Sequence, residues 1–183
     1  MTSPVPLRLG AAGAPVSFEF FPPNTPEGSE KLKTVVKQLG ALSPEFFSVT
    51  YGAGGATRGK TLQTVQDIAS AGHSAAPHLS CIGATRDSIA EILATYRAQD
   101  IRRIVALRGD MPSGTFTSGE FRYAVDLVRF IRETQGNDWQ IEVAAYPEYH
   151  PEQRYASKDL AHYVEKVKAG ANAAITQFFF NPD

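Results

Sequence analysis

Two carboxylate residues, Glu19 and Asp110, have sequence surroundings that suit acid–base chemistry. Glu19 stands in the stretch V-S-F-E-F-F-P-P at 16–23, with phenylalanines on both sides. An apolar environment disfavours a charged carboxyl, so we expect a raised pKa that suits Glu19 to donating a proton. Asp110 follows Arg108 and Gly109, and a neighbouring guanidinium favours the ionised form. The pair could divide the roles of acid and electrostatic stabiliser.

The stretch 16–23 itself predicts a buried strand that ends at two prolines. Proline has no N–H for a sheet ladder, and Pro23 disfavours helical angles at the residue before it. Alternation along the strand places Phe18 and Phe20 on one face and Glu19 on the other. Because an ionised carboxylate is costly to bury alone, Glu19 must be paired, protonated or used in chemistry. An ion pair without chemistry is the alternative interpretation.

Strands and helices alternate along the rest of the chain. The first predicted helix has Thr25 as N-cap, Pro26 at its first position and Gly40 at its end. Strand centres recur about every 27 to 38 residues, the length of a strand, a helix and two loops. Repeated β/α units without a hairpin signal predict a parallel sheet. The predicted strands are 16–23, 46–51, 75–81, 104–107, 141–145 and 173–179, and the later helices 57–71, 86–98, 120–133 and 158–169.

Two architectures have this pattern, an open doubly wound sheet and a (β/α)8 barrel. The first carries G-x-G-x-x-G after its first strand, whereas this turn reads P-P-N-T-P-E-G. A barrel places polar residues at the C-terminal ends of many strands. Such residues here are Glu19, Thr50, His78, Arg108, Asp110, Tyr146, His150 and Gln177. We predict an α/β fold of the (β/α)8, TIM-barrel type, as a single domain of residues 1–183 with about six of the eight units.

Composition excludes several classes of function. Charged residues are 20%, hydrophobic residues 43% and the formal net charge is -1, so no general attraction to nucleic acid or membrane is expected. No apolar run approaches the ~20 residues of a membrane span, and no signal peptide is evident, which favours a cytoplasmic protein. Cys81 is the lone cysteine and is predicted to be buried. The histidines lack metal-ligand spacing, so no metal site is expected.

The sequence G-A-G-G at 52–55 follows the second predicted strand. Glycines there let the backbone approach a phosphate or a flat ring. A plain turn without ligand contact is the alternative interpretation.

Six short strings together are typical of one enzyme family. They are F-E-F-F-P-P at 18–23, S-V-T-Y-G-A-G-G at 48–55, H-L-S-C at 78–81, A-L-R-G-D at 106–110, A-A-Y-P-E-Y-H-P-E at 144–152 and A-I-T-Q-F-F-F at 174–180. They occur in one order over nearly the whole chain. The sequence therefore resembles methylenetetrahydrofolate reductase.

The resemblance implies a flavoenzyme that holds FAD non-covalently at the C-terminal ends of the barrel strands. In that family NADH or NADPH reduces the flavin and leaves. The substrate 5,10-methylenetetrahydrofolate then takes its place and receives a hydride, giving 5-methyltetrahydrofolate. The implied partner is thus a small-molecule folate, with no nucleic acid and no membrane, and we expect the full-length protein to be a homo-oligomer.

The resemblance also implies roles for individual residues. Glu19 corresponds to the general acid that opens the folate ring, Asp110 to the carboxylate that stabilises the resulting cation, and Gln177 to a substrate contact. Without the resemblance, Lys166 would be interpreted as solvated helix surface and His78 as a core histidine. The positions that correspond to FAD contacts are Thr50, His78, Leu107, Arg108, Gly109, Asp110, Tyr123, Ala124, Tyr146, His150, Asp159 and Lys166.

The length departs from the family pattern. A complete barrel has eight strands, and this chain ends just past the sixth predicted one. We expect a C-terminally truncated reductase with most flavin determinants, compromised activity and exposed edge strands. Two other classes stay open: a shortened barrel that binds FAD or folate without catalysis, and an unrelated barrel hydrolase or lyase with Glu19 and Asp110 as acid and base.

Overall fold

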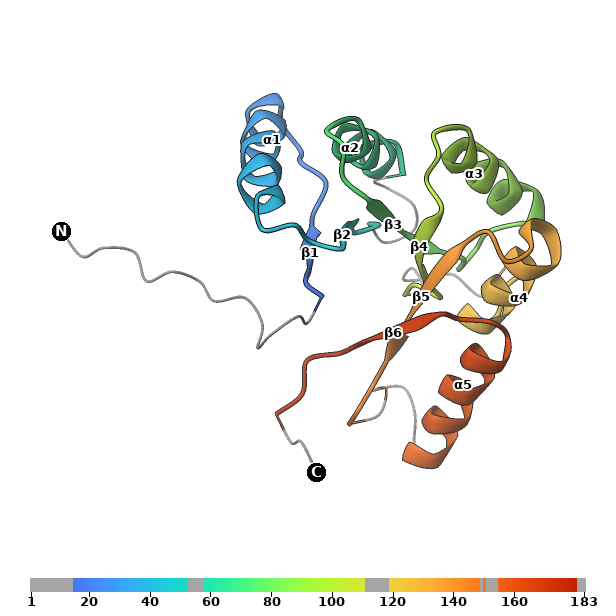
Figure 1. Ribbon diagram of the computed structural model, residues 1–183. Helices are drawn as coiled ribbons and strands as arrows, with labels where there is room; N and C mark the ends of the chain where they lie inside the picture. Colours follow the sequence, from blue (N-terminus) through green and yellow to red (C-terminus); the bar gives the residue numbers. More distant parts are fainter. Residues whose placement is uncertain (1–14, 53–57, 111–118, 149, 151–154, 181–183) are drawn as a thin grey trace.

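Six parallel strands form one curved sheet in the order β1-β2-β3-β4-β5-β6. The computed structural model describes residues 15–52, 58–110, 119–148, 150 and 155–180. The helices lie along the outer face of the sheet, with β1 and β6 at its edges (Figure 1). The predicted barrel type is confirmed as an incomplete (β/α) barrel. The strands are β1 (Ser17–Phe20), β2 (Phe46–Val49), β3 (Ala75–Ser80), β4 (Arg103–Leu107), β5 (Gln140–Ala145) and β6 (Ala173–Thr176).

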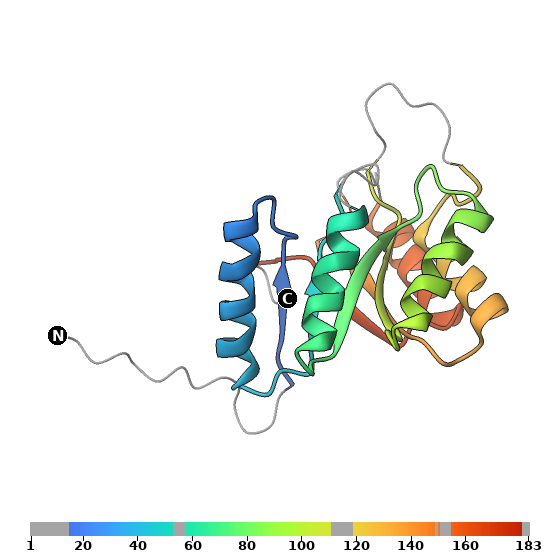
Figure 2. The same ribbon diagram turned by 90° about the horizontal axis from the view of Figure 1, so that it is seen from above.

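The first helix begins with a local signal that the sequence carries. In α1 (Pro26–Gly40) the Thr25 hydroxyl accepts a hydrogen bond from the Gly28 N–H at 3.1 Å, as predicted. Residues 53–55 of the glycine turn and the predicted helix start at residue 57 lie outside the described residues, and α2 is Arg58–Ser70. The helices α1, α2 and α3 (Arg86–Ala98) lie side by side (Figure 2). None of the described helices is long and apolar enough to cross a membrane.

The start of α4 (Ala124–Gln135) corrects a prediction. The sequence pattern placed it at Glu120, but two acidic side chains cap helices here. Asp126 accepts a hydrogen bond from the Tyr123 N–H at 2.9 Å, which fixes the first turn of α4. Glu120 accepts one from the Arg86 N–H at 2.8 Å and so caps α3. Both acids belong to helix entry, so helical periodicity overestimated the length of α4.

The main core lies between the sheet and the helices. Phe47 of β2 is fully buried, and the rings of Phe18 and Phe20 stack on it with centroids 5.9 and 5.5 Å away. This confirms the predicted face of the first strand and leaves Glu19 on the inner, concave face. Cys81 is buried as predicted, and burial raises the pKa of its thiol to about 12.

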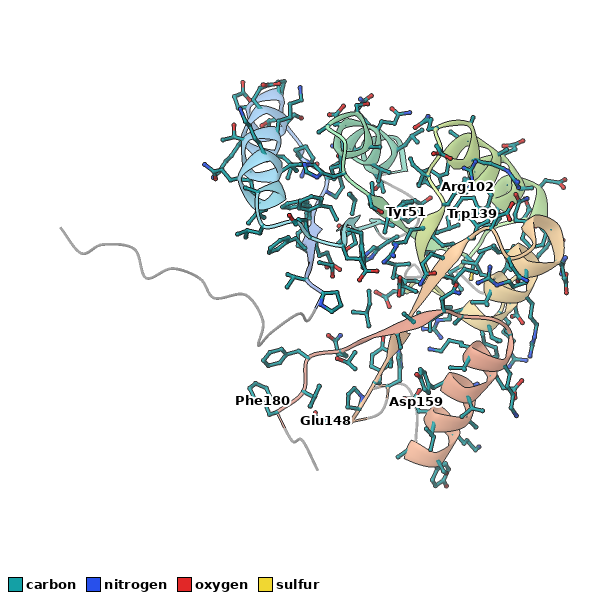
Figure 3. The ribbon with its side chains drawn as sticks, in the orientation of Figure 1. Tyr51, Arg102, Trp139, Glu148, Asp159 and Phe180 are labelled. Carbon is teal, nitrogen blue, oxygen red and sulfur yellow. The ribbon has the colours of Figure 1, made fainter. Side chains whose placement is uncertain are left out.

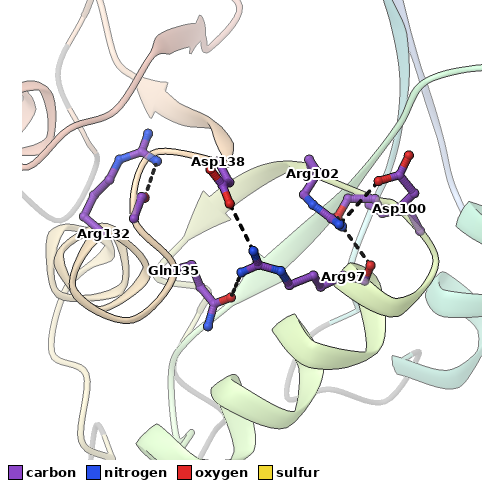
Figure 4. A network of polar contacts seen from close by, with 8 residues as sticks. Arg97, Asp100, Arg102, Arg132, Gln135 and Asp138 are labelled. Atoms are coloured by element: carbon purple, nitrogen blue, oxygen red, sulfur yellow. Dashed lines mark hydrogen bonds and ion pairs between the residues drawn. The ribbon is translucent and has the colours of Figure 1, made fainter.

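A network of arginines ties the N-terminal ends of the strands together (Figure 4). Arg132 of α4 donates to the Gly170 carbonyl at 2.7 Å and to the Trp139 carbonyl at 2.9 Å. Arg97 of α3 lies 3.0 Å from the Asp138 carboxylate. Since these partners directly precede β5 and β6, the arginines fix where both strands begin.

The last two elements of the chain, α5 (Ala156–Lys168) and β6, are more exposed to solvent than the earlier ones. All four residues of β6 are exposed, and α5 has no buried residue. The strand ends at Thr176, short of the predicted end at Phe179, and α5 begins before its predicted start at Lys158. The apolar side chains of Leu160 and Val167 are therefore open to solvent.

Candidate active site

A cavity of about 340 Å³ lies at the C-terminal ends of β3, β4 and β5 and reaches the start of α4 and one face of α5. No cluster of three or more His, Cys, Asp or Glu side chains suited to a metal ion occurs in the described part of the chain. The cavity instead combines cations, acids and aromatic rings. Its lining is Tyr51, Gly52, Ser80, Ala106, Leu107, Arg108, Gly109, Asp110, Tyr123, Ala124, Val125, Ala144, Tyr146, His150, Asp159, His162 and Lys166.

The turn after β4 brings backbone to the cavity wall. Gly109 has φ +83°, a left-handed conformation that favours glycine. A Cβ at this position would lie 1.9 Å from the Ser80 hydroxyl oxygen. The same hydroxyl donates to the Arg108 carbonyl at 2.9 Å and holds the turn. The packing of Ser80 against this turn therefore requires glycine at position 109.

One face of α5 supplies polar side chains to the cavity. Asp159, His162 and Lys166 are spaced so that they share that face, and Asp159 projects toward the segment after β5 (Figure 3). The Asp159 carboxylate accepts a hydrogen bond from the His150 N–H at 3.2 Å. Lys166 donates to the Ala144 carbonyl. Burial lowers the pKa of the Lys166 ammonium, and the Asp159 charge opposes this.

Two pairs of rings flank these polar groups. Tyr123 stacks on His162 with centroids 5.2 Å apart and an interplanar angle of 29°. Tyr146 and His150 meet edge to face at 4.7 Å. Aromatic faces of this kind suit a flat, conjugated ligand.

Glu19 lies on the concave face of the sheet, and its environment corrects a prediction. Its carboxylate oxygen Oε2 is 3.2 Å from His78 Nε2, and its side chain is 50% exposed. Contact with His78 lowers the pKa of Glu19, against a smaller raising effect of burial. The predicted rise is wrong because Phe18 and Phe20 face the other side of the strand, while Phe21 is 79% exposed.

Sequence comparison decides the family of the chain. The family model for methylenetetrahydrofolate reductase matches residues 8–183. The chain belongs to the methylenetetrahydrofolate reductase family. It is 50% identical to 5,10-methylenetetrahydrofolate reductase of Salmonella typhimurium over 168 residues, and 49% identical to that of Escherichia coli. Each match covers 91% of this chain and 55% of the relative, so the chain spans about half the length of these relatives.

A plant relative and two solved structures are more distant. The probable methylenetetrahydrofolate reductase (NADH) of rice is 37% identical, over 91% of this chain and 30% of its own length. The aldolase QR15 superposes with a TM-score of 0.59 at 11% identity, over 91% of this chain and 69% of its own. A Clostridium thermocellum protein that binds two copies of 5-methyl-5,6,7,8-tetrahydrofolic acid has a TM-score of 0.57 at 14% identity, over 91% and 55%. At these identities the structures show the fold alone.

In this reductase-family chain the cavity gathers most of the predicted cofactor positions. All the predicted FAD contacts line it except Thr50 and His78. Thr50 follows β2, where its carbonyl accepts a hydrogen bond from the Thr61 hydroxyl at 2.9 Å. His78 points to the concave face beside Glu19. The assignments as FAD contacts stay predictions. Ten of these residues line the cavity, and Thr50 and His78 do not.

The predicted folate-contacting residues of the chain are spread over three strands of the sheet. Asp110 is exposed and lies at the cavity wall after β4. Gln177 follows β6 and is exposed, and its N–H donates to the Ala145 carbonyl at 2.7 Å. Together with Glu19 these residues lie on β1, after β4 and after β6, so the concave face between them is where a shared ligand would have to lie.

Sequence reasoning missed several polar lining residues of the cavity, among them Ser80 and His162. Ser80 is two residues beyond His78 on β3, and strand alternation puts both on one face. His162 lies between Asp159 and Lys166 at helical spacing. Both signals were in the sequence, because each residue shares a face with a position already selected.

Proposed function

We propose that this chain carries the flavin and folate site of a reductase that converts 5,10-methylenetetrahydrofolate to 5-methyltetrahydrofolate with NAD(P)H. Membership of the family supports the reaction. The observation that carries the proposal for this chain is the cavity at the strand ends, which joins Arg108 and Lys166 to Asp110 and to aromatic rings. Cations, acids and rings together match a ligand with phosphates, hydroxyls and a conjugated system.

The residues present fit FAD. The turn at Gly109 brings backbone to the cavity wall, and the ring pairs at Tyr123 and Tyr146 offer faces for flat groups. Bound FAD would supply hydride chemistry, accepting a hydride from the nicotinamide and passing it to the folate. The chain itself binds, orients and shields the reacting groups.

Two cations are placed to hold the phosphates of the cofactor. Arg108 provides a planar fork of donors, and Lys166 provides a point charge. Lys166 is already desolvated, as its lowered pKa indicates. A phosphate would restore the favourable environment that burial removes from the ammonium. The Asp159 carboxylate accepts the His150 N–H beside them.

Glu19, Asp110 and Gln177 form the folate side of the proposal. Glu19 donates a proton to N10 of the folate as the bond between N10 and the methylene carbon breaks. Asp110 stabilises the cation left at N5 through its negative charge. Gln177 contacts the pterin with its amide, which can both donate and accept hydrogen bonds.

The electron donor is proposed as NADH or NADPH, and the name of the rice relative, which specifies NADH, favours NADH. The cytoplasmic location and the homo-oligomeric state of the full-length protein stay predictions.

The test separates the two half-reactions. We expect Glu19→Gln to leave FAD reduction by NADH within about twofold while lowering folate reduction by at least about a hundredfold, the scale of general-acid catalysis. Asp110→Asn should change both half-reactions, since its charge lies beside both ligands. Glu91→Gln, on the exposed face of α3, is the matched control.

Equal losses of both half-reactions in Glu19→Gln would contradict its role as the acid. Bound flavin that NADH does not reduce would favour a binding protein without catalysis.

A further inference from the structure

His78 is a buried histidine with one polar neighbour on the concave face. Its side chain is 11% exposed, and its Nε2 atom lies 3.2 Å from Glu19 Oε2. Among the described residues no group makes a well-aligned hydrogen bond to this nitrogen. A buried ring nitrogen without a partner is costly. The Glu19 carboxylate, 3.2 Å away, is the group within reach.

The other charged groups on this face are engaged elsewhere. From β4, Arg103 lies 3.2 Å from the Glu142 carboxylate of β5 and 2.7 Å from Glu45, before β2, and its guanidinium covers the Phe46 ring at 4.4 Å. These three groups compensate one another. From β2, Ser48 is buried, stands opposite Glu19 in the strand register and helps to lower the pKa of that carboxyl.

We propose that His78 is a positioning residue that orients the Glu19 carboxylate and returns a proton to it after each turnover. The inference rests on the proposed function. When the bond between N10 and the methylene carbon breaks, its electron pair goes to N10, which takes the proton of Glu19, and the cation remains at N5. Glu19 is then a carboxylate and takes the next proton from Nε2 of the His78 imidazolium. The imidazole regains its proton from water, which completes the balance.

The physical reason is that Glu19 by itself is a poor proton donor at neutral pH. A carboxyl group whose pKa lies below its ordinary value of 4.5 is ionised at neutral pH and is a poor acid. Because Nε2 of His78 lies 3.2 Å from Oε2 of Glu19, the ring can pass a proton directly to the carboxylate beside the folate.

The first test needs no cofactor and no turnover. In protein labelled with 13C at the Glu carboxyl groups, the Glu19 signal is assigned by its loss in Glu19→Gln. We expect the titration midpoint of Glu19 to rise by about one pH unit in His78→Phe, which keeps a buried ring and removes the charge. His73→Gln, a histidine substitution outside the concave face, should leave the midpoint unchanged. An unchanged midpoint in His78→Phe would overturn the proposal.

The second test uses the pH dependence of folate reduction. His78→Gln keeps an N–H donor near Glu19 but does not titrate. We expect the pH above which the rate falls to move down by at least about one unit, so that the loss is about tenfold at neutral pH and small near pH 5. An equal loss of rate at every pH, or a His78→Gln rate equal to that of the wild type at every pH, would mean that His78 only supports the fold. If the wild-type protein reduces no folate, the proposed function fails, and the carboxyl titration still decides whether the pair exists.

Discussion

The two ends of the strands hold their charged side chains in opposite ways. At the N-terminal ends, Arg132 binds backbone carbonyls and the Asn172 side chain at 2.6 to 3.2 Å. At the C-terminal ends, Lys166 lines a cavity, donates to the Ala144 carbonyl and has a pKa lowered by burial. The first arrangement satisfies the cation within the chain, whereas the second leaves part of that task to a ligand.

The difference separates residues that stabilise the fold from residues that bind. Guanidinium groups with several fixed acceptors contribute to the free energy of unfolding. A desolvated ammonium at a cavity costs stability until an anion arrives. Substitutions at the N-terminal ends should therefore change unfolding, and those at the C-terminal ends should change ligand affinity.

The largest effect on stability is expected from Arg132→Ala. It removes the donors to Gly170 and Trp139 and leaves their carbonyls short of partners, at a cost of about 3 kcal/mol in the free energy of unfolding. Urea denaturation measures this. Arg129→Ala, whose exposed side chain lies 3.1 Å from Glu165, is the control and should cost less than about 1 kcal/mol. Equal losses of unfolding free energy in Arg132→Ala and Arg129→Ala would contradict the stabilising role of the arginine contacts at the N-terminal ends of the strands.

Gly109→Ala should distort the turn after β4 that forms part of the cavity wall. The new Cβ would meet the Ser80 hydroxyl, and the left-handed backbone would be strained, at about 1 to 2 kcal/mol. We expect FAD affinity to fall at least tenfold in a fluorescence titration. Gly59→Ala is the matched control, because a Cβ there meets nothing and alanine favours the helix. Unchanged FAD affinity in Gly109→Ala would contradict the assignment of the turn.

Lys166→Met should lower FAD affinity with little change in the free energy of unfolding. Loss of the charge should weaken FAD about tenfold, because a charge-assisted contact to phosphate disappears. The free energy of unfolding should change by less than about 1 kcal/mol, since the desolvation cost disappears as well. Lys168→Met, at an exposed lysine of the same helix, should change neither quantity. A large loss of stability in Lys166→Met would mean that this lysine stabilises the fold, as the arginines at the N-terminal ends of the strands do.

The smallest effect is expected from Glu142 on the concave face. Burial raises the pKa of its carboxyl, and Arg103 opposes this. A group with a raised folded pKa stabilises the fold below its unfolded pKa, here 4.5, and loses that contribution as pH rises through the folded value. Relative to Glu142→Gln, the wild type should therefore lose unfolding free energy as pH rises above about 4.5. A difference that stays constant with pH would show that the carboxyl does not titrate as inferred.

Much of the fold and of the cavity lining followed from the sequence. Strand alternation fixed the face of Phe18 and Phe20, and the Thr25 cap fixed the start of α1, because both are local properties. The cavity residues after β4 followed because parallel strands end at one edge.

Other features depend on pairing across the sheet, which sequence periodicity does not encode. The contact of Glu19 with His78 joins β1 to β3, and that of Arg103 with Glu142 joins β4 to β5. Each requires the strand register and the side-chain rotamers. The prediction for the pKa of Glu19 is wrong for the same reason, since the phenylalanines beside Glu19 in the sequence do not surround it in space.

The most direct test of the cavity assignment is an anaerobic titration of the purified chain, followed by visible absorption, first with FAD and then with NADH. We predict that the chain takes up FAD with a shifted flavin spectrum and that NADH bleaches it, and that Gly109→Ala and Lys166→Met weaken the uptake. A folded chain that takes up no flavin, or one whose uptake neither substitution changes, would contradict the assignment of the C-terminal cavity as the cofactor site.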